Sequence, residues 1–262
     1  MESVSSDILQ ALILTKDEEP NIGRVLERIR WLEKIHVLDS FSSDATLEIA
    51  RSFPNVEVHF RKFDTFATQC NFGVSLIDCE WVLSLDADYI LTDDFVEETK
   101  LFVANSESPE VAYFTNFEFL VFGRQLISNN TTPRAVLFRK SFCTYYDDGH
   151  AHRLSITGKT ASYKSKILHD DRKSLSIWLN NQDRYSVQEC AKLLDAANPG
   201  NSSLLSKIRR TKVFAPILVF LYCLFGKRLL FGGWHGWHYT LQRTMVEMLL
   251  SLRLIEKTEL HD

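Results

Sequence analysis

The stretch Trp81-Val82-Leu83-Ser84-Leu85-Asp86-Ala87-Asp88 decides the fold, because a compact apolar run ends abruptly in two acidic residues. Short apolar runs of this kind are typical of strands buried on both faces of a parallel sheet. Two carboxylates at the end of such a strand can hold a hard divalent cation that also contacts phosphate oxygens. An Asp-x-Asp tripeptide such as Asp86-Ala87-Asp88 is also common in solvated turns. Its position in the fold therefore has to decide between a metal site and a turn.

Three strands with following helices precede this stretch. The expected strands cover residues 8–14, 34–38 and 56–60, and the expected helices cover residues 20–29, 44–50 and 66–77. The first helix has Pro20 in its first turn, and its apolar residues recur at the spacing of one helix face. Alternating strands and helices predict a parallel sheet with right-handed crossovers, which binds ligands at the carboxyl ends of its strands. Asp39 ends the second strand, so we expect it near Asp86 and Asp88.

The alternation weakens after Asp94. A helix to about residue 103 and strands near residues 111–121 and 135–139 are expected, and the chain becomes helical from Ser174 onward. A break is expected at residues 198–201. The sequence therefore predicts an α/β fold with a mixed, mainly parallel sheet flanked by helices, in a domain spanning residues 1–173. A helical, basic and aromatic extension follows over residues 174–262.

The composition is that of a folded globular protein, with 45% hydrophobic and 24% charged residues among 262. The five cysteines lack paired Cys-x-x-Cys spacing, which argues against a disulfide framework or a zinc knuckle. No basic start followed by an apolar stretch opens the chain. We therefore expect a cytoplasmic protein, and no nucleic-acid partner.

The C-terminal part has an unusual charge distribution, because no Asp or Glu lies between Asp195 and Glu247. The cations in this interval are Lys207, Arg209, Arg210, Lys212, Lys227, Arg228 and Arg243. Residues 213–225 form an uncharged run that is too short to cross a bilayer. One interpretation is that residues 207–237 rest on the anionic inner face of the cytoplasmic membrane. The other is a buried core helix or a dimer helix.

Four segments in this order carry a family resemblance. They are residues 11–22 (Ala-Leu-Ile-Leu-Thr-Lys-Asp-Glu-Glu-Pro-Asn-Ile), 37–46 (Val-Leu-Asp-Ser-Phe-Ser-Ser-Asp-Ala-Thr), 69–73 (Gln-Cys-Asn-Phe-Gly) and 81–88. The chain resembles family 2 glycosyltransferases over about residues 8–185, and most closely the bacterial branch that builds lipopolysaccharide core and other surface glycans. The fold of this family is called GT-A. Such enzymes pass a sugar from a nucleotide diphosphate donor to an acceptor hydroxyl, commonly with inversion at the anomeric carbon.

The resemblance assigns residues to the sugar donor. The implied donor-binding residues are Thr15, Glu18, Asp39, Asp86, Gln69 and Asn71. Thr15 and Glu18 would edge the nucleotide pocket, and Asp39 would accept a hydrogen bond from the base. Ordinary alternatives exist, because Thr15 and Glu18 can cap the next helix and Asp39 can end a strand in a turn. Gln69 and Asn71 can equally belong to a solvated helix face.

The same resemblance implies a divalent metal, Mg²⁺ or Mn²⁺. Asp88 would ligate it with help from Asp86. His169 follows the last strand of the domain and would complete the ligand set. Because imidazole suits Mn²⁺ better than Mg²⁺, a ligating His169 would favour manganese. A histidine held by structural hydrogen bonds is the alternative.

The segments expected on the acceptor side match the family's motifs less closely. Arg134 and Arg139 flank an expected strand that would face the acceptor, where both could pair with anionic groups. Related enzymes often carry His-Glu or Gly-His-x-Gln before Arg-Leu, whereas this chain has Ala151-His152-Arg153-Leu154. The catalytic base is therefore open between His152, Asp148 and neither of them.

The predicted function is transfer of a sugar from a nucleotide diphosphate-sugar, with a UDP-sugar favoured, to a glycan or lipid-linked acceptor. The setting would be lipopolysaccharide or other cell-surface polysaccharide biosynthesis. One alternative is a sugar nucleotidyltransferase, which needs a basic, Gly-rich loop after the first strand. Residues 15–19 contain one lysine, three acids and no glycine, which argues against it. The other alternative is a non-catalytic, membrane-associated adaptor that keeps only the scaffold.

Overall fold

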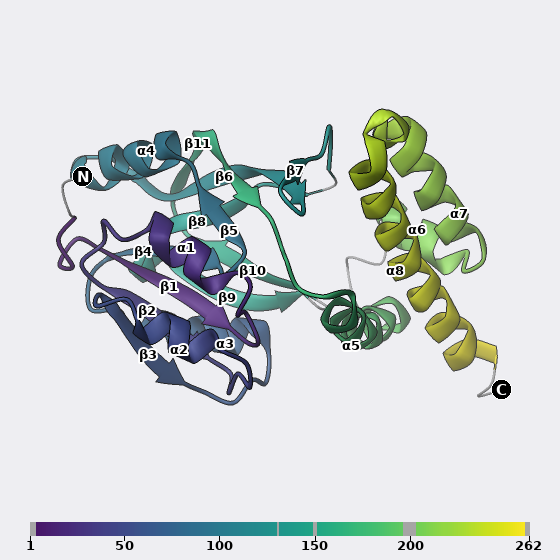
Figure 1. The fold of residues 1–262 in the computed structure, drawn as a ribbon, viewed down its shortest axis with the longest axis horizontal. Helices are drawn as coiled ribbons and strands as arrows, with labels where there is room; N and C mark the ends of the chain where they lie inside the picture. The colour runs from purple at the N-terminus through teal and green to yellow at the C-terminus, as the bar shows by residue number, and fades with distance from the viewer. Residues whose placement is uncertain (1–3, 130, 149–150, 196–202, 260–262) are drawn as a thin grey trace. The chain divides into compact units, whose positions relative to one another are not determined.

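The computed structural model describes residues 4–129, 131–148, 151–195 and 203–259 (Figure 1). The chain forms two compact units, each with its own internal contacts. The first comprises residues 1–122, 130–147 and 152–172, and the second comprises residues 123–129, 148–151 and 173–262. The break predicted at residues 198–201 lies outside the described residues.

A mixed sheet forms the centre of the first unit, with strands in the order β3-β2-β1-β4-β8-β6-β11-β5. The strands are β1 (Leu9–Thr15), β2 (Ile35–Asp39), β3 (Val56–Phe60), β4 (Trp81–Asp86), β5 (Tyr89–Leu91), β6 (Glu110–Val121), β8 (Arg134–Arg139) and β11 (Lys159–His169). Strands β3, β2, β1 and β4 run parallel to one another, as do β6 and β11. Strands β8 and β5 run antiparallel to their neighbours. The predicted α/β class with a mainly parallel, mixed sheet is confirmed.

Helices cover both faces of this sheet. They are α1 (Ile22–Arg28), α2 (Thr46–Arg51), α3 (Phe66–Ser75) and α4 (Asp93–Ala104). Apolar residues of α1, α2 and α4 pack with one set of alternate strand residues, including Ile13 and Val37. Residues of α3 pack with the other set, including Leu12 and Leu38. Because successive strand residues point to opposite faces, this division explains why the strands are apolar without alternation.

Helix α3 lies close against the sheet. Thr65 begins it by accepting a hydrogen bond from the Thr68 N–H at 3.2 Å, which is an N-cap. A side chain at Gly73 would meet Leu12 at 2.5 Å, so glycine permits this close approach. The short helix η1 (Lys140–Phe142) leads into β9 (Cys143–Asp148), which pairs with β10 (Ala151–Ile156) in a separate two-stranded sheet.

The second unit is mainly helical and includes the two-residue strand β7 (Arg124–Gln125). Its helices are α5 (Leu175–Leu194), α6 (Leu204–Arg210), α7 (Phe214–Leu221) and α8 (Gly233–Glu259), with a π-helical turn over Tyr222–Gly226 and a 3₁₀ turn over Leu229–Phe231. The helix predicted from Ser174 onward begins there, since Ser174 caps α5 by accepting from the Ile177 N–H at 3.4 Å. No helix among the described residues combines the length and apolar character needed to cross a bilayer.

A buried ion cluster lies inside the second unit. The Arg209 guanidinium donates to Glu247 at 2.8 and 3.1 Å and to Glu189 at 3.2 Å. Glu247 is 1% exposed, and Arg243 approaches it at 3.7 Å. Arg209 and Arg243 are two of the cations in the basic interval between Asp195 and Glu247. Both are engaged with buried carboxylates.

Candidate functional site

The carboxyl ends of the parallel strands bring the predicted residues together. Thr15 is the register partner of Asp39, and Leu14 is the register partner of Asp86. The ends of β2, β1 and β4 therefore coincide at one edge of the sheet, as expected for a ligand site in an α/β fold. We call this the carboxyl edge.

Asp39 lies at this edge as a fully buried carboxylate. Thr15 donates to its Oδ2 at 2.8 Å. Ser42 donates to the same oxygen through its hydroxyl at 2.6 Å and to Oδ1 through its backbone N–H at 2.7 Å. Asp39 is 0% exposed, so it fixes the end of β1 and the loop after β2 from within.

The loops after β1 and β2 are tied to each other. The Asp17 N–H donates to the Ser42 hydroxyl at 2.8 Å, and the Ser43 N–H donates to Asp17 Oδ1 at 2.8 Å. Asp17 and Phe41 both have positive φ, 53° and 64°, which is uncommon for residues other than glycine. Strained backbone that is held by such contacts is a feature of preorganised sites.

Asp86 carries a more accessible carboxylate. Arg134 of β8 donates to its Oδ2 at 3.4 Å and to the Tyr89 hydroxyl at 3.3 Å. The Asp86 and Arg134 side chains are 44% and 48% exposed. Burial, together with the charge of Asp86, raises the pKa of Tyr89, so its phenol stays protonated. The carboxyl edge therefore presents an anion and a cation side by side.

Asp88 and His169 form a second, less accessible pair. The His169 Nε2 lies 3.1 Å from Asp88 Oδ2, and the two side chains are 23% and 14% exposed. Phe119 and Tyr89 border the imidazole, with ring centroids at 4.2 and 5.6 Å. Burial opposes the charged imidazolium, but the Asp88 carboxylate outweighs it, so the pKa of His169 is raised.

The predicted metal ligands offer suitable donor types, two carboxylates and an imidazole. Asp88 and His169 already approach each other with their donor atoms. Asp86 is instead held by Arg134, and the three donors do not converge within 4.8 Å among the described residues. The donor set fits a divalent cation of the Mg²⁺ or Mn²⁺ type, provided that Asp86 turns from Arg134 toward Asp88.

His152 of β10 lies between aromatic rings. Its imidazole centroid is 5.5 Å from Phe66 and 5.4 Å from Tyr145. Burial lowers the pKa of His152, while Asp86 and Asp147 raise it and Arg134 lowers it, with the net shift downward. Two consequences follow. The imidazole is neutral near pH 7, and it lies within the electrostatic reach of the carboxyl edge.

Asp148, the other predicted base, belongs to the second unit, where its carboxylate accepts a hydrogen bond from Lys192. Its neighbour Asp147 belongs to the first unit and accepts from the Ala67 N–H at 3.0 Å, at the first turn of α3. The structure therefore groups His152 with Asp147 rather than with Asp148.

The predicted donor residues on α3 have their amides engaged within the protein. Gln69 donates to the Ser40 hydroxyl at 3.1 Å and accepts from Arg61 at 2.5 Å, and it is 1% exposed. Asn71 makes two 2.9 Å hydrogen bonds with the backbone of Tyr145. These contacts hold α3 against the loop after β2 and against β9, so both amides position the site.

Two further predicted residues lie apart. Glu18 accepts a hydrogen bond from Asn21 at 3.0 Å at the start of α1. This position is close to the alternative role, in which Glu18 caps that helix. Arg139 stacks on Trp81 with its guanidinium 4.6 Å from the ring centroid, and the two are register partners at the amino end of β4. Since β8 is antiparallel to β4, Arg139 lies about 17 Å along the strand from Arg134. The structure does not bring Arg139 to the carboxyl edge.

Several residues at this edge were not identified from the sequence. Phe41 and Phe60 stack with centroids 5.8 Å apart and are 58% and 44% exposed. Phe60 is the register partner of Asp39, so an exposed aromatic pair borders the carboxyl edge. Asp170, 1% exposed, binds Arg24 at 2.7 Å and Arg172 at 2.8 Å and thereby fixes the end of β11.

The comparison with family models identifies one match, "Glycosyl transferase family 2", over residues 11–117. An uncharacterised glycosyltransferase of Rickettsia bellii is 24% identical over 179 residues, which are 64% of this chain and 58% of that protein. One of Rickettsia conorii is 25% identical over 179 residues, 64% and 61% of the two chains. The match thus spans about three fifths of the length of these relatives.

Solved structures show weaker similarity. The chain is similar to Staphylococcus aureus TarS 1–349 in complex with UDP, with 12% identity, a TM-score of 0.49, and coverage of 97% of this chain and 91% of that one. It is also similar to the mannosyltransferase PcManGT of Pyrobaculum calidifontis in complex with GDP-Man and Mn²⁺, with 16% identity, a TM-score of 0.49, and coverage of 97% and 87%.

The family match includes Thr15, Asp39, Asp86 and Asp88, whereas Arg134, His152 and His169 lie beyond it. The strands β1, β2 and β4 and the carboxyl edge that they form lie within the segment that matches the glycosyl transferase family 2 model.

Proposed function

We propose that the protein is a metal-dependent, inverting glycosyltransferase that uses a nucleotide diphosphate-sugar. The observation that supports this most directly is the coincidence of the ends of β1, β2 and β4, which gathers Asp39, Asp86 and Asp88 at one edge. Carboxylates of different exposure at one edge can serve different tasks. The buried Asp39 shapes the site, whereas Asp86 and Asp88, which are 44% and 14% exposed, meet the ligand.

The nucleobase stacks on the exposed pair Phe41 and Phe60, since aromatic faces bind bases without needing a specific hydrogen bond. Asp39 is sealed behind Thr15 and Ser42 and acts on the nucleotide by holding these two residues. A uracil nucleotide is the favoured donor. The diphosphate points along the edge toward Asp86, Arg134 and Asp88.

Asp88 and His169 would hold the metal, with Asp86 as the third ligand. When bound, Mg²⁺ or Mn²⁺ supplies positive charge that stabilises the leaving diphosphate. Arg134, released from Asp86 by this change, can pair with a phosphate oxygen or with an anionic acceptor group.

His152 is the favoured general base, because it is neutral and is grouped with Asp86 and Arg134. The imidazole takes the proton of the acceptor hydroxyl while that oxygen attacks the anomeric carbon. The bond between the anomeric carbon and the donor phosphate oxygen breaks, and the diphosphate leaves from the opposite face. This displacement inverts the anomeric configuration.

The acceptor is a glycan or a lipid-linked glycan of the kind used for lipopolysaccharide or other surface polysaccharides. Support comes from the apolar surface of α7, the turns after it and the start of α8, where Phe214, Phe225, Phe231 and Trp234 are 63%, 62%, 80% and 57% exposed. The cations Lys207 and Arg228 lie exposed in the same unit. An anionic leaflet would cover this surface through apolar burial and Coulomb attraction, making the protein peripheral on the inner membrane face.

Calorimetric titration of the full-length protein with UDP, GDP, CDP and ADP, each with and without Mn²⁺, tests the donor site. We expect one nucleotide, UDP, to bind at least tenfold more tightly when Mn²⁺ is present. The Phe60→Ser variant should weaken UDP binding with the metal still present. Equal, metal-independent binding of all four nucleotides, or none by any of them, would contradict the proposal. Release of inverted product from the corresponding nucleotide-sugar and an oligosaccharide acceptor then tests the reaction.

A further inference from the structure

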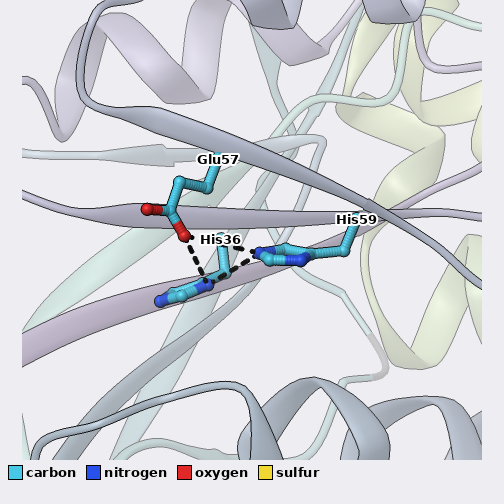
Figure 2. A group of neighbouring side chains, drawn as sticks. All are labelled: His36, Glu57 and His59. Atoms are coloured by element: carbon cyan, nitrogen blue, oxygen red, sulfur yellow. Dashed lines mark hydrogen bonds and ion pairs between the residues drawn. The ribbon is translucent and has the colours of Figure 1, made fainter.

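A second group of metal-ligating side chains lies away from the carboxyl edge, in the middle of β2 and β3 (Figure 2). His36 comes from β2, and Glu57 and His59 come from the edge strand β3. His36 is the register partner of Glu57, and residues two apart on a strand share a face, so the three side chains point to the same side of the sheet. Neither the family match nor the proposed reaction assigns these residues a role.

Their donor atoms are close together. His36 Nδ1 lies 3.0 Å from His59 Nε2, and the Glu57 Oε2 lies 3.9 Å from the first and 3.8 Å from the second. A point equidistant from these three atoms is about 2.1 Å from each, which is the bond length of Zn²⁺ to imidazole nitrogen and to carboxylate oxygen. Tetrahedral bonds of that length require about 3.4 Å between each pair of donor atoms, so the nitrogen–nitrogen contact would open slightly and the Glu57 oxygen would move slightly closer to both nitrogens.

The hydrogen bonds behind His36 fix its ring nitrogens. Gln10 donates to the Ser6 carbonyl at 2.9 Å, so its Oε1 faces the other way and accepts from the Asp78 N–H at 3.3 Å. The same oxygen lies 2.9 Å from His36 Nε2, which must therefore carry the proton. The Nδ1 lone pair of His36 then points away from Gln10 toward His59 and Glu57. Oriented imidazole ligands in metal sites are held by the same type of hydrogen bond to the second nitrogen.

Access and charge also fit a metal ion. His36 is 1% exposed, whereas Glu57 and His59 are 53% and 27% exposed, so the group opens to solvent on the edge-strand side. Lys34 lies 3.5 Å from Glu57 and 3.4 Å from Asp78, so it keeps a carboxylate partner if Glu57 turns to a metal. Burial, with a smaller contribution from the charge of Lys34, lowers the pKa of His36 to about 4, consistent with a neutral imidazole.

We infer that His36, Glu57 and His59 form a site for a borderline divalent cation of the Zn²⁺ class, with a solvent molecule as the fourth ligand. Two imidazoles and one carboxylate are the donors that such ions prefer, whereas Mg²⁺ and Ca²⁺ prefer oxygen. The ion would join the edge strand β3 to β2 and stabilise the folded state. The site is independent of the carboxyl edge and of the proposed reaction.

Titration of chelator-treated, full-length protein with Zn²⁺ tests the site, with Asp88→Asn as the matched control that alters only the carboxyl edge. We expect His59→Gln to weaken the tightest Zn²⁺ binding at least about a hundredfold, and Glu57→Gln to weaken it about tenfold. Asp88→Asn should keep this binding. Zn²⁺ should also raise the thermal midpoint of the wild type and not of His59→Gln. Equal binding by wild type and His59→Gln would overturn the inference, as would loss of the tight binding in Asp88→Asn.

Histidine side-chain ¹⁵N spectra provide a second readout that requires no activity. In the metal-free protein His36 should show the Nε2–H tautomer, and Zn²⁺ should shift His36 Nδ1 and His59 Nε2 together. A His36 with its proton on Nδ1, or a Zn²⁺ response at His59 alone, would overturn the site.

Discussion

Two clusters of charged residues, one in each unit, differ in how completely their charges are compensated. At the carboxyl edge of the first unit, Asp86 is 44% exposed and meets Arg134 at 3.4 Å. In the second unit, Glu247 is 1% exposed and takes two short hydrogen bonds from Arg209. The first cluster can exchange its protein partners for a ligand, whereas the second cannot do so without unfolding.

The difference separates groups that act on a ligand from groups that hold the fold. A buried carboxylate that loses its charge leaves its cation uncompensated, and this costs stability. When a partly exposed carboxylate loses its charge, water solvates the cation that it had paired with. The loss then appears in binding and catalysis and not in stability. The comparison therefore predicts opposite phenotypes for acids in the two clusters.

The largest effect is expected for Glu247→Gln, which leaves the buried Arg209 with Glu189 as its remaining acidic partner among the described residues. We expect a loss of about 3–5 kcal/mol in the free energy of unfolding of the second unit. Urea denaturation followed by far-UV circular dichroism measures it. The matched control is Glu259→Gln on the same helix, where the carboxylate that pairs with Lys212 is 61% exposed, and it should change little. Similar midpoints for the two variants would show that the cluster does not hold the unit together.

The second prediction concerns Asp88→Asn. We expect turnover to fall by about a hundredfold to a thousandfold, because the charge that holds the metal and the diphosphate is lost. The thermal midpoint should stay near that of the wild type, and a chelator should reproduce the loss in the wild type. Wild-type turnover in Asp88→Asn, or unfolding of the variant, would remove the contrast with Glu247.

The third prediction compares His152→Gln with Asp148→Asn by turnover at saturating substrates. We expect about a hundredfold loss for His152→Gln. The loss for Asp148→Asn should be much smaller, because the Asp148 carboxylate is engaged with Lys192. A larger loss in Asp148→Asn would reverse the assignment of the base.

The pH dependence gives an independent check of the same assignment. Burial lowers the pKa of His152 below the ordinary value of about 6.5, and only neutral imidazole accepts a proton. Turnover should therefore be flat near neutrality and fall as the pH drops through that lowered pKa. An acid limb above pH 6.5 in the wild type would contradict the role of His152.

Much of the first unit was predictable, because apolar runs, helix spacing and turn residues are local signals. Strand β3 was predicted at its observed bounds, Val56–Phe60, and the ends of β2 and β4 were placed at the acids. The convergence of Asp39 and Asp86 then followed from parallel strands alone.

The remainder of the site depends on pairings that the sequence does not display. Asp148 was one of the two candidate bases, although Asp147 shares the strand face of the buried Tyr145, and the two-residue period of β9 could have revealed this. Arg139 was assigned to the acceptor because the register of β8 against β4 was unknown. The His36 group needs the same register information, since His36 lies more than twenty residues from Glu57 and His59.

In the second unit, the sequence identified the apolar run over residues 213–225. It did not show which of the neighbouring cations point inward and which point to solvent. Arg209 and Arg243 turn toward Glu247, and Lys212 binds Thr258 at 2.7 Å. A count of cations along the chain cannot tell inward from outward side chains. The surface available to anionic lipid is therefore less basic than the sequence indicates, and its apolar side chains carry more of the expected binding.

The smallest effects are expected for the proposed membrane surface. Phe214→Ser removes a side chain that is 63% exposed on α7 and should weaken binding to vesicles containing anionic lipid by about tenfold, as apolar burial of a large side chain is worth about 1.5–3 kcal/mol. Lys227→Gln should weaken it about fivefold at low salt and not at high salt, because lipid surface potentials are screened. Leu101→Ser, at a residue 70% exposed on α4 in the first unit, is the matched control and should bind as the wild type does. If Phe214→Ser and Leu101→Ser both bind vesicles like the wild type in sedimentation, the exposed face of α7 does not contact the membrane. Its apolar residues would then belong to a protein interface, and the wild type but not Phe214→Ser should associate with itself at high concentration.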